Sequence, residues 1–200
     1  ITILEDLAMM SQNGFDVTLE LADAYIRTKE YQKAIEKYNI LLDKATPREA
    51  KTVNLLLCEL YITWAIDMAE QNKMDESYEY LKSAMQFNAI NPEIYYNVAK
   101  NYYKQKNYTS AIESVNQAIE YDKQNDYKAK YLLLLSEAHH QLGNFFEEKK
   151  ALTDLLKFDE KNPNGLYRVG LMYAAQHDIK NAEEAFKKAI MYDPELLQAK

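Results

Sequence analysis

Residues 92–125 read PEIYYNVAKNYYKQKNYTSAIESVNQAIEYDKQN, and the centre of this stretch recurs along the chain. The segment YTSAIE at residues 108–113 returns as YQKAIE at residues 31–36 and as IKNAEE at residues 179–184. Weaker copies stand at residues 74–77 and 145–148. The shared anchor positions 34, 77, 111, 148 and 182 are 43, 34, 37 and 34 residues apart, which indicates a repeat of 34 residues with small insertions.

Large and small side chains keep a fixed order within each copy. The seventh position is always large and apolar, and the eighth is always small. A small residue there lets two helices approach closely, while its bulky neighbour fills the groove between them. The pairs are Leu21 and Ala22, Trp64 and Ala65, Val98 and Ala99, Leu135 and Ser136, and Val169 and Gly170.

A period of 34 residues is that of the tetratricopeptide repeat, a unit of two antiparallel helices. The chain resembles that family closely, and the resemblance implies an all-α fold, a right-handed superhelical α–α solenoid. A single array is expected over residues 1–200, with a helix at 1–14 from a truncated repeat and the start of a further helix at 197–200. The five repeats are expected at residues 15–48, 58–91, 92–125, 129–162 and 163–196.

Two features depart from the regular pattern. Residues 48–57, inserted between the first and second copies, carry helix-forming residues, so we expect them to lengthen the first helix of the second repeat. In the fourth repeat, Glu148 occupies a position that is otherwise small, and His139 replaces the usual aromatic residue. We therefore expect the fourth repeat to be packed less tightly than its neighbours.

Composition and charge argue against several classes of protein. Four glycines and four prolines in 200 residues are too few for the many turns of a sheet-rich fold. A net charge of −7 disfavours binding to a nucleic-acid backbone. Cys58 is the only cysteine, so no internal disulfide forms. No run approaches about 18 consecutive apolar residues, so we expect no membrane span.

The same features favour a cytoplasmic location. No signal peptide is visible at the start of the sequence. The chain begins with Ile1 rather than Met, and we expect it to be a fragment of a longer array. An exported or periplasmic location therefore stays open.

No catalytic constellation emerges from the sequence. His139 and His140 are adjacent, so on a helix their side chains point about 100° apart and do not share a metal ion. Glu137 and His140 share a face, but the second Glu-x-x-His of a carboxylate-bridged metal site is missing. The four glycines are too dispersed for a phosphate-binding loop. We expect no enzyme activity, no bound metal and no cofactor.

The resemblance also implies a binding surface. In this family the first helix of each repeat lines a concave groove, which usually binds an extended peptide or a partner helix. The fifth position of every repeat is apolar here, and a repeated apolar stripe is typical of a binding surface. The residues expected to contact a partner are Leu19, Ile62, Ile66, Tyr96, Asn97, Lys100, Tyr103, Lys104, Lys130, Leu133, Glu137, His140, Tyr167 and Arg168.

Charge is unevenly distributed over the groove positions. The first two repeats place five acids and one base there, and the last three place two acids and four bases. We hypothesise that a ligand directs its acidic portion toward the four bases Lys100, Lys104, Lys130 and Arg168. Solvation of an exposed helix face explains such charges equally well. The carboxylate clamp that some relatives use for chaperone tails is not implied, because Asn97 and Lys130 match only two of its five positions.

These observations favour a non-enzymatic scaffold or adaptor that binds a protein or peptide partner in the groove. Tyr96, Tyr103 and Tyr167 are the expected anchors, because aromatic residues are enriched at interface hot spots. One alternative is a structural protein that assembles into homo-oligomers. Another is the regulatory arm of an enzyme whose catalytic domain lies outside these residues.

Overall fold

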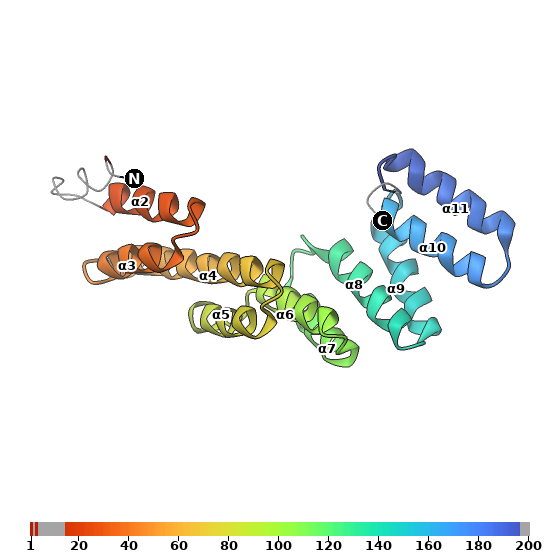
Figure 1. Ribbon diagram of the computed structural model, residues 1–200, viewed down its shortest axis with the longest axis horizontal. Helices are drawn as coiled ribbons and strands as arrows, with labels where there is room; N and C mark the ends of the chain where they lie inside the picture. Colours follow the sequence, from red (N-terminus) through yellow and green to blue (C-terminus); the bar gives the residue numbers. More distant parts are fainter. Residues whose placement is uncertain (2, 4–14, 197–200) are drawn as a thin grey trace. The chain divides into compact units, whose positions relative to one another are not determined.

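Ten helices in five sequential pairs make up the part of the chain that the computed structural model describes, residues 1, 3 and 15–196 (Figure 1). The all-helical expectation is thus confirmed. The helix expected at 1–14 and the one starting at 197–200 fall on residues 2, 4–14 and 197–200, outside the described part. The helices are α2 (Phe15–Arg27), α3 (Tyr31–Leu42), α4 (Pro47–Glu70), α5 (Met74–Phe87), α6 (Pro92–Lys104), α7 (Tyr108–Tyr121), α8 (Lys128–Gln141), α9 (Phe145–Phe158), α10 (Pro163–Ala175) and α11 (Ile179–Tyr192).

The helices fall into two compact units, Ile1–Asn97 and Val98–Lys200, and the boundary in the sequence lies within α6. In the first unit α2 packs on α3, α3 on α4 and α4 on α5. In the second unit α7 packs on α8, α8 on α9, α9 on α10 and α10 on α11. Each helix therefore packs mainly against its neighbours in sequence, as in other repeat arrays.

The turn inside each helix pair has the same backbone conformation in all five repeats. The fifteenth residue of each repeat lies in this turn and takes the left-handed conformation, with φ between 59° and 71°. In the third repeat, Lys106 N–H donates to the Tyr103 carbonyl and Asn107 N–H donates to the Tyr102 carbonyl, both at 2.9 Å. This pair of bonds is the Schellman motif, which satisfies the last carbonyls of a helix. The left-handed residues are Lys29, Asn72, Lys106, Gly143 and His177.

The next helix of each pair begins directly after this turn. Asn107 Oδ1 accepts from Ser110 N–H at 3.2 Å, and Asp178 Oδ1 accepts from Asn181 N–H at 3.2 Å. Such caps satisfy orphan donors at a helix start. One helix therefore ends and the next begins within three residues, which explains why the chain needs so few glycines and prolines.

The eighth position is packed as the sequence predicts. Ala22, Ala65, Ala99 and Ser136 are completely buried. At Gly170, a Cβ atom would lie 2.5 Å from the ring of Phe186, so only glycine allows α10 to approach α11 this closely.

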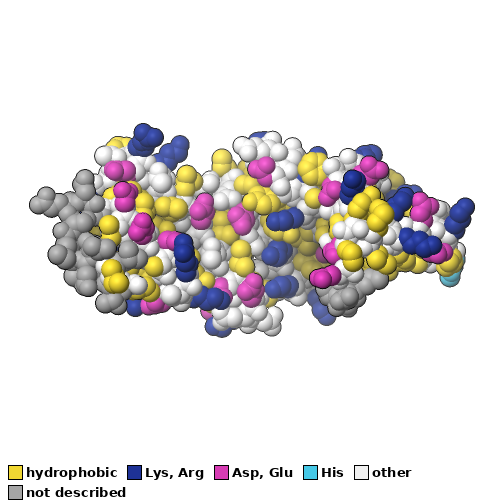
Figure 2. All heavy atoms as spheres, turned by 90° about the horizontal axis from the view of Figure 1, so that it is seen from above, with side chains coloured by type: hydrophobic (Ala, Val, Ile, Leu, Met, Phe, Trp, Pro, Cys, Tyr) yellow, Lys and Arg dark blue, Asp and Glu magenta, His cyan; other side chains and the backbone are white. Residues whose placement is uncertain are grey.

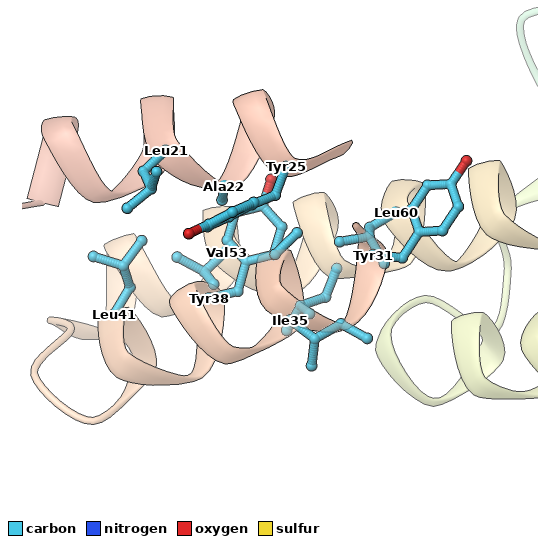
Figure 3. Packing of buried hydrophobic residues seen from close by; sticks show 11 residues of the cluster. Leu21, Ala22, Tyr25, Tyr31, Ile35, Tyr38, Leu41, Val53 and Leu60 are labelled. Atoms are coloured by element: carbon cyan, nitrogen blue, oxygen red, sulfur yellow. The ribbon is translucent and has the colours of Figure 1, made fainter. Parts of the chain in front are cut away.

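Figure 3 shows the core of the first unit. Leu21 and Tyr25 of α2 face Tyr38 and Leu41 of α3. Toward α5 the packing becomes aromatic: the Trp64 ring stacks on Tyr31 of α3 at 5.2 Å and on Tyr80 of α5 at 4.0 Å between centroids. Stacked rings add to the free energy gained by burying their area. One side chain of α4 therefore joins three helices.

The inserted residues 48–57 extend α4, which is 24 residues long, whereas α2 and α6 each have 13. This confirms the expected lengthening. Among the described helices, only α4 has the length and hydropathy that a membrane-spanning helix needs. It also packs on both α3 and α5, and core helices of water-soluble proteins pass the same test. The absence of a membrane span stays a prediction.

Replacing Lys106 by glycine is expected to stabilise the protein. A left-handed conformation costs an L-residue about 1–2 kcal/mol, and glycine removes that cost at an entropic penalty of roughly 0.5–1 kcal/mol. Lys106→Gly should therefore raise the free energy of unfolding in urea by about 0.5–1 kcal/mol. Lys51→Gly, in the second turn of α4, is the matched control and should lower it by about 1 kcal/mol. A Lys106→Gly variant no more stable than the parent would contradict the reasoning.

Alkaline pH should destabilise the first unit through Tyr38. Burial raises the pKa of this phenol to about 12, and the charges of Asp23 and Glu59 add to the effect. The folded state thus holds its proton more tightly than the unfolded state, and stability falls as pH rises from about 10 to 12, by roughly 2–3 kcal/mol. Urea unfolding at a series of pH values should show a shallower decline for Tyr38→Phe than for the parent. The exposed Tyr192→Phe variant should follow the parent.

Candidate functional site

The side chains predicted to line a groove are only partly accessible in the first unit. Leu19, Ile66 and Tyr96 are half-buried. Ile62 and Asn97, in contrast, are 2% and 6% exposed. Burying an isoleucine is favourable wherever neighbouring helices cover it, and Asn97 is satisfied internally by donating to the Glu93 carbonyl at 2.9 Å. The expectation that Ile62 and Asn97 are presented to a partner is therefore corrected.

The second unit keeps more of the predicted surface accessible. Lys104, Lys130 and His140 are exposed, while Lys100, Tyr103, Leu133, Glu137, Tyr167 and Arg168 are intermediate. Tyr103 meets Tyr108 edge to face at 5.3 Å and is hydrogen-bonded to Gln141 of α8. Burial raises the pKa of Tyr103, and the nearby Glu137 charge adds to this. Tyr103 is therefore a neutral, positioned aromatic side chain.

Glu148 of α9 is a buried carboxylate of this unit, with 4% of its surface exposed. Its carboxylate accepts from Arg168 Nη2 at 3.3 Å through Oε1, and its Oε2 lies 3.0 Å from His140 Nδ1. Arg168 Nη1 lies 3.5 Å from Glu137 Oε1. Because burying a carboxylate is unfavourable unless it is paired, these contacts explain how a glutamate occupies a position that is otherwise small. The four side chains join α8, α9 and α10.

This ion cluster changes the predicted charge pattern. Arg168 was expected to attract the acidic part of a ligand, yet only 15% of its side chain is exposed and two carboxylates neutralise it. The Lys130 ammonium lies 4.8 Å from the centre of the Tyr127 ring. On the face shown in Figure 2, basic and acidic side chains are interspersed with apolar ones, and no single basic field covers it. Arg168 is therefore not one of the bases that would attract the acidic portion of a ligand.

A pocket of about 330 Å³ opens beside the ion cluster, between α9 and α10. The sequence did not point to it, although Glu148, one of its residues, was noted as a departure from the repeat. It is lined by His140, Phe145, Glu148, Lys149, Arg168, Leu171, Met172, Ala175 and Gln176.

No group of three or more His, Cys, Asp or Glu side chains is placed to hold a metal ion in the described part of the chain. Burial lowers the pKa of His139. Burial also raises the pKa of the Cys58 thiol, which disfavours the reactive thiolate.

Two family models of the tetratricopeptide repeat match the chain, at residues 68–134 and at residues 163–196, together about half of its length. The chain belongs to the tetratricopeptide repeat family. Proteins of this family generally mediate protein–protein interactions, and the fold is typically non-catalytic. No curated protein sequence matches the chain significantly.

Solved structures share the tetratricopeptide fold at low sequence identity. A chain of the APC/C hetero-tetramer Cut9-Hcn1 aligns with a TM-score of 0.67 and 15% identity over 98% of this chain, which spans only 36% of that longer chain. MamA aligns at 0.64 and 18% identity over 88% of this chain and 96% of MamA. YrrB, a TPR protein with an unusual peptide-binding site, aligns at 0.62 and 16% identity over 98% of this chain and 95% of its own.

Removing the buried carboxylate should destabilise the second unit. Glu148→Ala leaves Arg168 with Glu137 alone, and breaking one side of a buried ion pair costs about 3 kcal/mol. The double variant Glu148→Ala with Arg168→Met should recover most of that loss in urea unfolding, because no buried charge then lacks its partner. Glu147→Ala is the matched control: its exposed pair with Lys150 should contribute less than about 1 kcal/mol. Equal effects at the two glutamates would contradict the role of Glu148.

Proposed function

We propose that this tetratricopeptide repeat protein is a non-enzymatic adaptor that binds a segment of another protein on the first-helix faces of its repeats. One observation carries the proposal: Tyr96, Tyr103, Leu133 and Tyr167 stay partly accessible on first helices. Packed helices usually cover side chains of this size, and aromatic side chains beside polar ones are typical of interface hot spots.

Family membership supports the same function, since relatives generally act through protein partners. YrrB has a peptide-binding site in an array of similar fold, and we extend that property to this chain as part of the proposal. The accessible surface here differs from the one that the sequence indicated, because Ile62 and Asn97 are interior and Arg168 is paired within the protein.

Self-assembly is the second candidate. Ile190, Met191 and Tyr192 near the end of α11 are 38%, 64% and 40% exposed. Apolar side chains gathered at the end of a helix suit a contact with another copy. Light scattering over a range of concentrations separates this candidate from the adaptor. A constant monomer mass would exclude self-assembly of this chain.

The adaptor proposal is tested by affinity capture with a triple variant. Tyr96→Ala, Leu133→Ala and Tyr167→Ala together should abolish capture of the protein's partners, because truncating anchor side chains typically costs more than about 1 kcal/mol each. The matched control replaces three exposed apolar residues of second helices, Ile40, Phe158 and Met191, with alanine. Circular dichroism and thermal unfolding must first show that both variants fold. If the two variants capture the same partners, the first-helix surface is not the binding site.

A further inference from the structure

The pocket between α9 and α10 has an uncovered aromatic wall. Phe145, the seventeenth residue of its repeat, is 65% exposed. At the same position of the first repeat, Tyr31 is 5% exposed because it stacks on Trp64 of the following repeat, and Met74 of the second repeat is 9% exposed. At this position Tyr108 of the third repeat is half-buried, and Ile179 of the fifth repeat is 66% exposed. A phenylalanine left in water where Tyr31 and Met74 are covered is the kind of site at which a partner side chain gains binding energy.

The opposite wall is also apolar. Leu171 of α10 is 45% exposed, and Met172 and Ala175 line the pocket beside it. At about 330 Å³, the pocket lies at the small end of the range for ligand sites. This volume suits one or two amino-acid side chains rather than a cofactor. His140 and Arg168, which line the pocket, are among the residues expected to contact a partner, so the pocket adjoins the proposed binding surface.

One cation at the pocket, Lys149, has no acidic partner among the described residues. Both oxygens of Glu148 are already engaged, by Arg168 and by His140. Arg168 Nε is buried and has no acceptor among the described residues. Lys149 is exposed at the pocket and forms no ion pair within the described part of the chain. An occupant that brings a carboxylate next to Lys149 would therefore complement the charge of that lysine.

We propose that this pocket receives a large apolar side chain of a linear protein segment, with Lys149 binding an acidic residue next to that side chain. The proposal rests on the adaptor function and names the sequence class that the second unit recognises. The apolar side chain fills the space between Phe145 and Leu171, where it removes both from water. The neighbouring carboxylate gives the interaction its preference for acidic segments and its dependence on salt.

Titration of defined peptides into the isotope-labelled 200-residue chain tests the proposal by NMR. The probes are capped peptides Gly-Ser-Glu-X-Glu-Gly-Ser with X as Leu, Phe or Ala, and the same peptides with Lys in place of both Glu. The Leu and Phe peptides with Glu should shift the amide signals of Phe145, Lys149, Leu171 and Ala175. The Ala peptide and the Lys-flanked peptides should bind at least about tenfold more weakly.

Variants separate the two parts of the site. Leu171→Arg should abolish the shifts by filling the pocket, and Lys149→Glu should reverse the preference between the Glu-flanked and Lys-flanked peptides. Met191→Arg and Lys180→Glu on α11 are the matched controls. They should change neither the amide shifts nor the preference between the Glu-flanked and Lys-flanked peptides. If the Leu and Phe peptides leave the pocket amides unmoved at millimolar concentration, or if Lys149→Glu keeps the original preference, the proposal is overturned.

A failure of the pocket is distinguishable from a failure of the adaptor function. Affinity capture separates the two proposals. If Leu171→Arg keeps every partner that the Tyr96, Leu133 and Tyr167 triple variant loses, the adaptor function is supported and the role of the pocket is overturned. Loss of partners in both variants supports the two proposals together. Retention of all partners in both variants overturns both.

Discussion

A methyl group in place of the hydrogen on Gly170 would lie 2.5 Å from the Phe186 ring, and the small residue at the same position of every other repeat is completely buried. Ala22, Ala65, Ala99 and Ser136 hold that position with no exposed surface. Because the paired helices touch there, their other side chains have fixed neighbours. The accessible faces of the first helices and the pocket beside α10 depend on this spacing.

A second position of the repeat is small in the other four copies, and Glu148 shows how a larger, charged residue is accommodated there. A carboxylate stands where other repeats have alanine or serine, and Arg168 and His140 come from α10 and α8 to pair with it. The exchange replaces a close apolar contact by a charged one that reaches across three helices. The same cluster forms the polar floor of the pocket, so a departure from the repeat pattern coincides with the feature most suited to a ligand.

The helices could be predicted from the sequence because the signals are local and repeated. The 34-residue period, the pairs such as Val98 and Ala99, and the helix-forming residues of the insertion all act within one or two helices. Accessibility could not be predicted in the same way. Ile62 and Asn97 were expected to face the groove, yet both are buried. Arg168 is neutralised by residues 20 and 31 positions earlier in the chain. Such outcomes depend on which neighbours cover or pair with a side chain, and one sequence does not contain that information.

The left-handed turns have a consequence for how the chain acquires its structure. Each turn is closed by backbone hydrogen bonds between residues at most five positions apart, so a helix pair forms without waiting for distant segments. Chains dominated by such short-range contacts fold rapidly, and arrays of this type nucleate at more than one place. A repeat can therefore accept a longer first helix. The 24 residues of α4 include additional helical turns, yet the Schellman turn at Asn72 is unchanged. The ten-residue insertion of this chain is thus absorbed by a helix, while the turn inside the repeat keeps its form.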